Sequence, residues 1–107
     1  MSVEDKDFID IISIDKEENA VLTISDHLEW DEANEHLLIL QAKINSYLGA
    51  IESGELYLKY PNAKGKNICI RVVALYEPNV DGFKFLESVK EVLIDAGYGF
   101  TFLIHRP

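Results

Sequence analysis

Residues 67–76, which read NICIRVVALY, decide the fold because they form the clearest strand pattern in the chain. Apolar residues occupy both faces of this stretch: Ile68, Ile70, Val72 and Ala74 on one, Cys69, Val73 and Leu75 on the other. A strand that is apolar on both faces is typical of the interior of a sheet. We therefore expect residues 67–76 to form a central strand, with the other elements arranged around it.

Two strands and a long helix are predicted before this central strand. Residues 8–14 and 20–25 are rich in β-branched residues and are separated by a short polar turn, which predicts a hairpin. Residues 31–53 carry apolar side chains at helical spacing, with Asp31 as the candidate N-cap and Gly54 as the stop signal. The predicted core face of this helix comprises Ala33, Leu37, Leu40, Ile44, Leu48 and Ile51.

A second helix and a last strand are predicted after the central strand. Pro78 and Asn79 open the helix, and residues 98–105 alternate as a strand does. The predicted core face of this helix comprises Phe83, Leu86, Val89, Leu93 and Ala96. Residues 55–66 are ambiguous: Leu56, Leu58 and Tyr60 alternate as in a strand, whereas Tyr57 and Tyr60 would share a helix face. Pro61, Asn62 and Gly65 then mark a loop.

The element order is ββαβαβ, and its two βαβ units predict right-handed crossovers between parallel strands. We expect a two-layer α+β fold in which a four-stranded mixed sheet has its antiparallel strand at one edge. Both helices are expected to pack on one face of this sheet. Residues 1–107 show no linker or repeat, so a single domain is predicted.

Charge is distributed unevenly along the chain. The net charge is −9, and residues 1–54 hold 13 acidic and 3 basic residues, whereas residues 55–107 hold 6 acidic and 7 basic residues. Nucleic-acid binding needs clustered Lys and Arg, so this balance argues against it. An acidic surface favours encounter with a basic protein, although negative charge also keeps a small protein soluble.

The composition indicates a cytoplasmic protein. Cys69 is the only cysteine, which excludes an internal disulfide and suits a reducing compartment. The first residues are acidic and lack the apolar run of a signal peptide, and no stretch is long and apolar enough to span a membrane. No membrane association is expected.

The densest group of polar residues lies between the hairpin and the first helix, in residues 25–36, which read SDHLEWDEANEH. It would follow a parallel strand and precede a helix, where α/β sheets form clefts. The candidate binding residues are Asp26, His27, Glu29, Trp30 and Asp31. Trp30 could anchor a partner, or it could pack across the start of the helix while Asp26 or Asp31 caps it and Glu32 pairs with His36.

The same segment offers a candidate metal site. Glu32 and His36 are four residues apart on one helix face, and His27 could approach from the loop, which gives zinc two imidazoles and a carboxylate. His27 or His36 beside a carboxylate could also perform acid–base chemistry. No HExxH motif, nucleophile elbow, phosphate loop or glycine fingerprint accompanies these residues, so no catalytic residue and no cofactor is predicted.

A second stripe on the first helix suggests self-association. It lies opposite the predicted core face and comprises Ile39, Ala42, Ser46 and Ala50. Small residues four apart allow another backbone to approach closely, and Ile39 would otherwise be exposed to water. A homodimer through this face is therefore one prediction, with good helix formers as the simpler explanation.

Several segments resemble a family of short bacterial proteins of unknown function. The resemblance is carried by FIDIISID at residues 8–15, LTISDHLEW at 22–30, HLLILQAKINSYL at 36–48 and YPNAKG at 60–65. The motif Ile-Ser-Asp-His-Leu-x-Trp, at residues 24–30, is its most specific part. The resemblance implies a bacterial, cytoplasmic origin and supplies no catalytic residues.

Two hypotheses from different classes follow. The first is a non-enzymatic protein-binding domain, immunity-like or regulatory, whose acidic first half engages a protein partner that can be basic. The alternative is a small enzyme or metal-binding protein that uses His27, Glu32 and His36.

Overall fold

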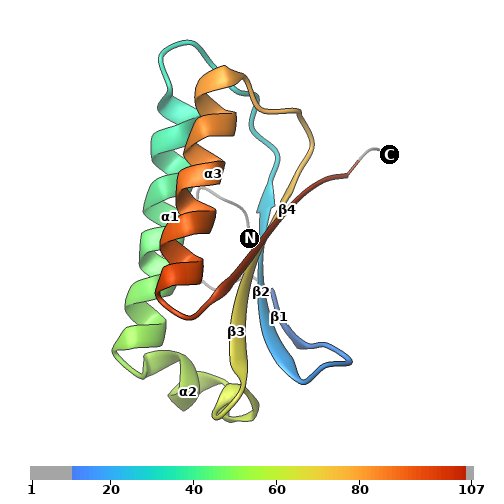
Figure 1. The fold of residues 1–107 in the computed structure, drawn as a ribbon, viewed down its shortest axis with the longest axis vertical. Coiled ribbons are helices and arrows are strands. Elements are labelled where there is room, and N and C mark those ends of the chain that lie inside the picture. The colour runs from blue at the N-terminus through green and yellow to red at the C-terminus, as the bar shows by residue number, and fades with distance from the viewer. Residues whose placement is uncertain (1–10, 106–107) are drawn as a thin grey trace.

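The computed structural model describes residues 11–105, which form a four-stranded sheet with helices on one of its faces (Figure 1). The elements in chain order are β1 (Ile11–Ile14), β2 (Asn19–Asp26), α1 (Glu35–Glu52), α2 (Glu55–Lys59), a 3-10 helix η1 (Pro61–Ala63), β3 (Asn67–Ala74), α3 (Val80–Asp95) and β4 (Gly99–Ile104). The predicted two-layer α+β fold is confirmed, with α2 as an additional short helix. Residues 8–10 of the first predicted strand lie outside the described residues.

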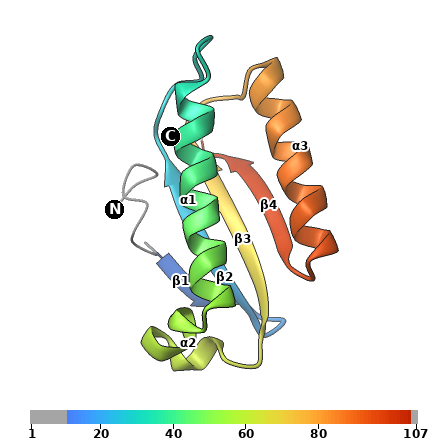
Figure 2. The ribbon, with the colours of Figure 1, turned by 90° about the vertical axis from the view of Figure 1, so that its left-hand side faces the viewer.

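The sheet has the order β1-β2-β3-β4. β1 pairs antiparallel with β2 at one edge, and β2, β3 and β4 are parallel. Both βαβ crossovers step in the same direction across the sheet, and right-handed crossovers of this kind place their helices on the same face. Accordingly, α1 and α3 lie side by side over one face of the sheet (Figure 2).

The core lies between this face and the helices. The residues of β2 and β3 that point toward the helices are almost fully buried: Ala20, Leu22, Ile24, Ile68, Ile70 and Val72. From the helices, they meet Leu40, Ile44 and Ile51 of α1 and Leu86 and Leu93 of α3. The prediction of a central strand is therefore confirmed for β3, which ends at Ala74, and residues 75–76 lie beyond it.

The buried faces of the helices differ from the predicted ones. On α1, the polar residues His36, Lys43 and Tyr47 are also buried. On α3, Phe83 was predicted to be buried but is 59% exposed, because only the inner flank of this helix contacts the sheet. Ala33 precedes α1 and is exposed, which corrects its assignment to the core.

The ambiguous residues 55–66 close one end of the sheet. Gly54 adopts a positive φ of 83° after α1, so the chain turns there and forms α2 and then η1. Leu56 and Ala63 are buried and join the core. This segment therefore lies at the opposite end of the molecule from the carboxyl ends of β2 and β3 (Figure 1).

Candidate functional site

The candidate site lies where β2 and β3 end, at the top of Figure 1. Asp26 and Ala74, the last residues of these strands, are partners in the parallel register, so both strands stop at the same level. Residues 27–34 lead from β2 to α1, and residues 75–79 lead from β3 to α3. The prediction that the polar segment follows a parallel strand is confirmed.

Two hydrogen bonds connect these two loops, and a third joins the first loop to the first turn of α3. Trp30 Nε1 donates to the carbonyl oxygen of Tyr76 over 3.2 Å. The Asn34 amide donates to Asp81 Oδ2 over 3.2 Å, and the Asn79 amide donates to the carbonyl oxygen of Asp31 over 3.4 Å. Residues far apart in the sequence thereby form one surface at this end of the sheet.

A buried carboxylate–imidazole pair lies beneath the loops. Asp26 Oδ2 and His36 Nε2 are 2.5 Å apart, and the two residues are only 1% and 3% exposed. Asp26 Oδ1 also accepts a hydrogen bond from the backbone N–H of Leu28, which bends the chain out of β2. A carboxylate and an imidazole this deeply buried are tolerated in the core because each satisfies the other, and removing one would leave the other unpaired.

The second imidazole nitrogen of His36, Nδ1, is buried and has no hydrogen-bond partner among the described residues. A neutral ring that donates from Nε2 to Asp26 leaves only a lone pair unsatisfied at Nδ1, which costs less than an unpaired N–H. Neither nitrogen reaches the surface. The arrangement therefore suits a structural pair better than acid–base catalysis, which requires contact with a substrate.

Asp31 caps α1 from a distance. The helix begins at Glu35 rather than at the predicted Asp31, and Asn34 occupies the N-cap position in a left-handed conformation. The Asp31 carboxylate nevertheless accepts hydrogen bonds from the backbone N–H groups of Glu35 and His36, at 3.2 and 3.1 Å. These donors, above all that of His36, lower the pKa of the Asp31 carboxyl from its ordinary range.

Trp30 is fixed between the two halves of the site. Its ring centroid lies 4.0 Å from that of His36, with the planes tilted by 41°. On the side of α3 it lies against Gly82, where an added Cβ would come within 2.5 Å of Trp30 Cε3. Trp30 is half-buried and packs against the core, so its indole is largely occupied within the molecule.

The structure separates the predicted binding residues into two groups. Asp26 is buried and Trp30 and Asp31 are half-buried, whereas His27 and Glu29 are exposed. Contacts within the fold therefore occupy much of the first group, and the exposed pair belongs to the outer surface.

The predicted metal trio is not assembled. Among residues 11–105, no three His, Cys, Asp or Glu side chains are placed to hold a metal ion. Glu32 is exposed in the turn before α1 and does not pair with His36, which is bound to Asp26 instead. The prediction placed Glu32 and His36 on one helix face, but α1 begins only after Glu32.

The predicted self-association stripe on α1 does not have the exposed environment that was expected for it. All four of its residues, Ile39, Ala42, Ser46 and Ala50, are half-buried. Ile39 packs against the core cluster rather than facing water. The stripe lies beside the buried face of the helix, which includes Lys43 and Tyr47, and not opposite to it.

Carboxylates dominate the outer surface of the site. Six exposed or half-buried acidic residues from the two loops and the first turns of the helices form what we call the acidic end: Glu29, Asp31, Glu32, Glu35, Glu77 and Asp81. Residues 17–42 and 72–83 contain no Lys or Arg. The same two segments also carry the exposed apolar side chains of Leu38, Tyr76 and Val80.

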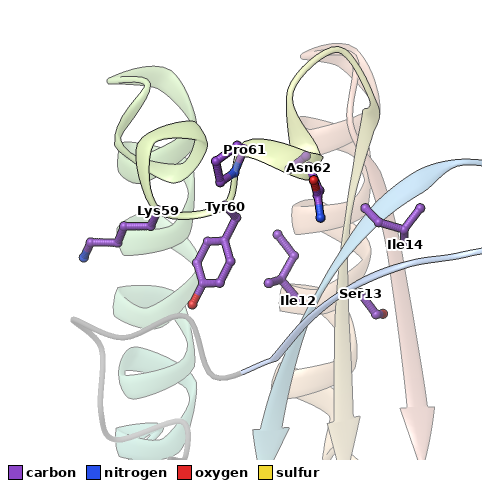
Figure 3. A pocket seen from close by; sticks show the side chains of 8 residues that line it. Ile12, Ser13, Ile14, Lys59, Tyr60, Pro61 and Asn62 are labelled. Carbon is purple, nitrogen blue, oxygen red and sulfur yellow. The ribbon is translucent and has the colours of Figure 1, made fainter.

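A hollow of about 280 Å³ lies elsewhere, between β1 and the segment formed by α2 and η1 (Figure 3). Ile12 and Tyr60 approach each other across it, with Asn62 above them, and Lys59 points away. Lys59 Nζ lies 3.3 Å from Glu55 Oε1, with which it forms an ion pair. None of the predicted site residues lines this hollow.

Residues 1–106 match the model of a family described as a family of unknown function, DUF6572. The chain belongs to the DUF6572 family. The resemblance to a family of unknown function is thereby confirmed. No curated protein and no solved structure matches the DUF6572 chain. Within its described residues, no helix is long and apolar enough to cross a membrane.

Sequence reasoning missed several residues that build the site in this DUF6572 protein. It did not pair Asp26 with His36, and it did not find Asn34, Asp81 or Gly82. Gly82 gave the clearest signal, because a glycine inside a helical pattern often marks a close approach. Asn79, predicted with Pro78 to open the second helix, is the N-cap of α3, and its side chain accepts a hydrogen bond from the backbone N–H of Gly82 over 2.8 Å.

Proposed function

We propose that this DUF6572 protein is a non-enzymatic protein-binding domain whose acidic end engages a basic protein partner. The observation that carries the proposal is the acidic end itself, where two loops and two helix starts place six carboxylates together. The sequence around them, residues 17–42 and 72–83, holds no Lys or Arg, which favours a negative field at this end. Such a field raises the rate of encounter with a cationic surface.

The apolar side chains beside the acidic end support a protein as the partner. Tyr76 and Val80 are 42% and 71% exposed, and protein interfaces combine such residues with a polar rim. Nucleic acid is disfavoured, since phosphates would be repelled by this surface. Neutralising or regulating a cationic protein, as an immunity protein does, fits this description.

The structure modifies the role of Trp30 in this proposal. Because its indole is held by His36, Gly82 and the Tyr76 carbonyl, Trp30 positions the loops that carry the acids rather than serving as the main anchor. The proposal also places the protein in the cytoplasm. The single cysteine, Cys69, is a free thiol and cannot form an internal disulfide, which supports a reducing compartment.

The test compares two variants with the same change in net charge. In the first, Glu29, Glu32 and Glu35 of the acidic end are each changed to Gln. In the matched control, the exposed residues Glu17, Glu52 and Glu91 are changed to Gln. Each tagged protein is used to capture partners from a lysate of its native cell at about 0.05 M and about 0.5 M salt, and the captured protein is then purified for titration.

We expect wild type and control to bind one cationic protein at low salt and to release it at high salt. The acidic-end variant should bind it at least about tenfold more weakly, since three rim charges of about 0.5 kcal/mol each are lost. Equal binding by the two variants, binding that resists salt, or no captured partner would each overturn the proposal.

A further inference from the structure

One flank of α3 carries four exposed residues at helical spacing: Phe83, Glu87, Lys90 and Ile94. Their spacing of four, three and four residues aligns them along the helix in what we call the α3 stripe. Phe83 is 59% and Ile94 54% exposed, so both apolar ends of the stripe face solvent. The buried residues of the same helix, such as Leu86 and Leu93, lie on an adjacent flank.

The α3 stripe lies at the outer side of the molecule. α3 lies over the edge of the sheet formed by β4, and α1 lies on the opposite side of α3 from this edge (Figure 2). Phe83, Glu87 and Lys90 border a groove of about 360 Å³ between α3 and β4. Nothing among the described residues separates this flank from solvent, as the exposure of its two apolar residues shows.

The order of residues in the α3 stripe is self-complementary. From either end, the stripe reads apolar, charged, charged, apolar. The first charged residue is negative when the stripe is read from Phe83 and positive when it is read from Ile94. When two such helices pair antiparallel about a twofold axis at their centre, position 83 faces position 94 of the second copy and position 87 faces position 90. Phe83 then meets Ile94, and Glu87 meets Lys90, and each contact occurs twice.

The charges around the α3 stripe favour the same arrangement. Residues 83–94 contain two acidic and two basic residues, so this segment is neutral although the chain carries −9. Lys84 and Glu91 are also exposed, and the twofold operation brings each of them within two positions of the other on the second copy. Residues 83–94 of two copies can therefore face each other without a net like charge between these segments.

We propose that a second copy of the chain docks along the α3 stripe to form a twofold antiparallel dimer. The α1 stripe of Ile39, Ala42, Ser46 and Ala50 is less suited to this role, since its residues are half-buried and Ile39 packs against the core. The proposal does not rest on the proposed function, because Glu87 and Lys90 lie outside the acidic end.

The test is a charge exchange, read by sedimentation equilibrium of the full chain at about 0.15 M salt, where charges separated by more than about 8 Å are screened. Wild type is expected to show a reversible monomer–dimer equilibrium. Glu87→Lys and Lys90→Glu should each weaken the dimer at least about tenfold, since each places like charges opposite one another twice. The double variant and an equimolar mixture of the two single variants should both recover dimerisation, because opposite charges meet again.

Circular dichroism checks that each variant is folded, which is expected because both side chains are exposed. A wild type that stays monomeric at every concentration would overturn the proposal. So would single variants that dimerise as wild type does, or a mixture that fails to recover the dimer. A dimer that survives Glu87→Lys but is lost in Ala42→Arg would place the contact on α1 instead.

Discussion

α1 and α3 occupy equivalent positions in two crossovers of the same hand, yet they divide their polar and apolar residues in opposite ways. α1 buries polar groups: His36 pairs with Asp26, and Lys43 lies with its Nζ 5.3 Å from the centroid of the Tyr47 ring. α3 buries a narrow apolar face and leaves Phe83 and Ile94 outside.

The difference follows from position in the sheet. α1 connects the two central strands, so its whole inner half is covered and any polar side chain there needs a partner. α3 connects β3 to the edge strand β4, so the sheet covers only one flank of the helix. Although both helices connect parallel strands in the same way, α1 is fixed by specific polar pairs, whereas α3 keeps an exposed apolar surface.

The largest expected effect is on the pair that fixes α1. Asp26→Ala leaves His36 buried without its partner at Nε2, which should lower the free energy of unfolding by about 3–5 kcal/mol. Urea denaturation measures this loss. In a double-mutant cycle with His36→Leu, the double variant should lose less than the sum of the single losses. Additive losses would show that the two side chains are not coupled.

The contact between Trp30 and α3 should give the next largest effect. Gly82→Ala forces a methyl group against the indole and should destabilise the fold by about 1–3 kcal/mol. In a Trp30→Ala background the obstacle is gone, and the same substitution should stabilise by up to about 1 kcal/mol because alanine is the better helix former. Thermal denaturation of wild type, Gly82→Ala, Trp30→Ala and the double variant measures the effect of the substitution on stability in each background. A destabilisation of equal size in both backgrounds would contradict the contact.

The start of α1 should respond to acid. The Asp31 pKa is lowered in the folded state, so its contribution to stability is present above the ordinary carboxyl pKa of about 4 and is lost as pH falls through the folded value. Asp31→Asn should therefore be less stable than wild type at neutral pH, with the difference shrinking below about pH 4. Glu32→Gln, which removes an exposed carboxylate from the adjacent turn, is the matched control.

The smallest effect is expected on the exposed side of α3. Phe83→Ser should change the free energy of unfolding of the monomer by no more than about 0.5 kcal/mol, the usual range for surface positions. Leu86→Ala, three residues later on the buried flank, should cost about 2–5 kcal/mol. Both are measured at high dilution, where self-association does not contribute. Comparable losses would mean that Phe83 belongs to the core after all.

Much of the fold was predictable because strand and helix periodicities repeat over many residues. β3 was expected as the central strand from its two apolar faces, and β1 was expected at an edge from the short turn that follows it. The acidic first half and the position of residues 25–36 after a parallel strand were equally visible in the sequence. These features depend on local pattern and on the handedness of crossovers, both of which act residue by residue.

The site itself was less predictable. The sequence placed Asp26, Trp30, Asp31 and His36 in one segment, but it suggested His36 as a partner of Glu32 or as a metal ligand. Where α1 begins decides this outcome, since a start at Glu35 leaves Glu32 in the preceding turn and leaves His36 to pair with Asp26. A shift of a few residues at a helix start is below the resolution of sequence patterns.

By itself, the sequence determined the order of the strands and of the two long helices, the central strand and the sign of the charge, because these follow from composition and periodicity. Only the tertiary structure decided that Trp30 meets Gly82, that Glu77 and Asp81 join the acidic end, and that Phe83 and Ile94 stay outside. These outcomes depend on how far each helix extends over the sheet. That extent is set by the packing of segments distant in sequence, which no local pattern encodes.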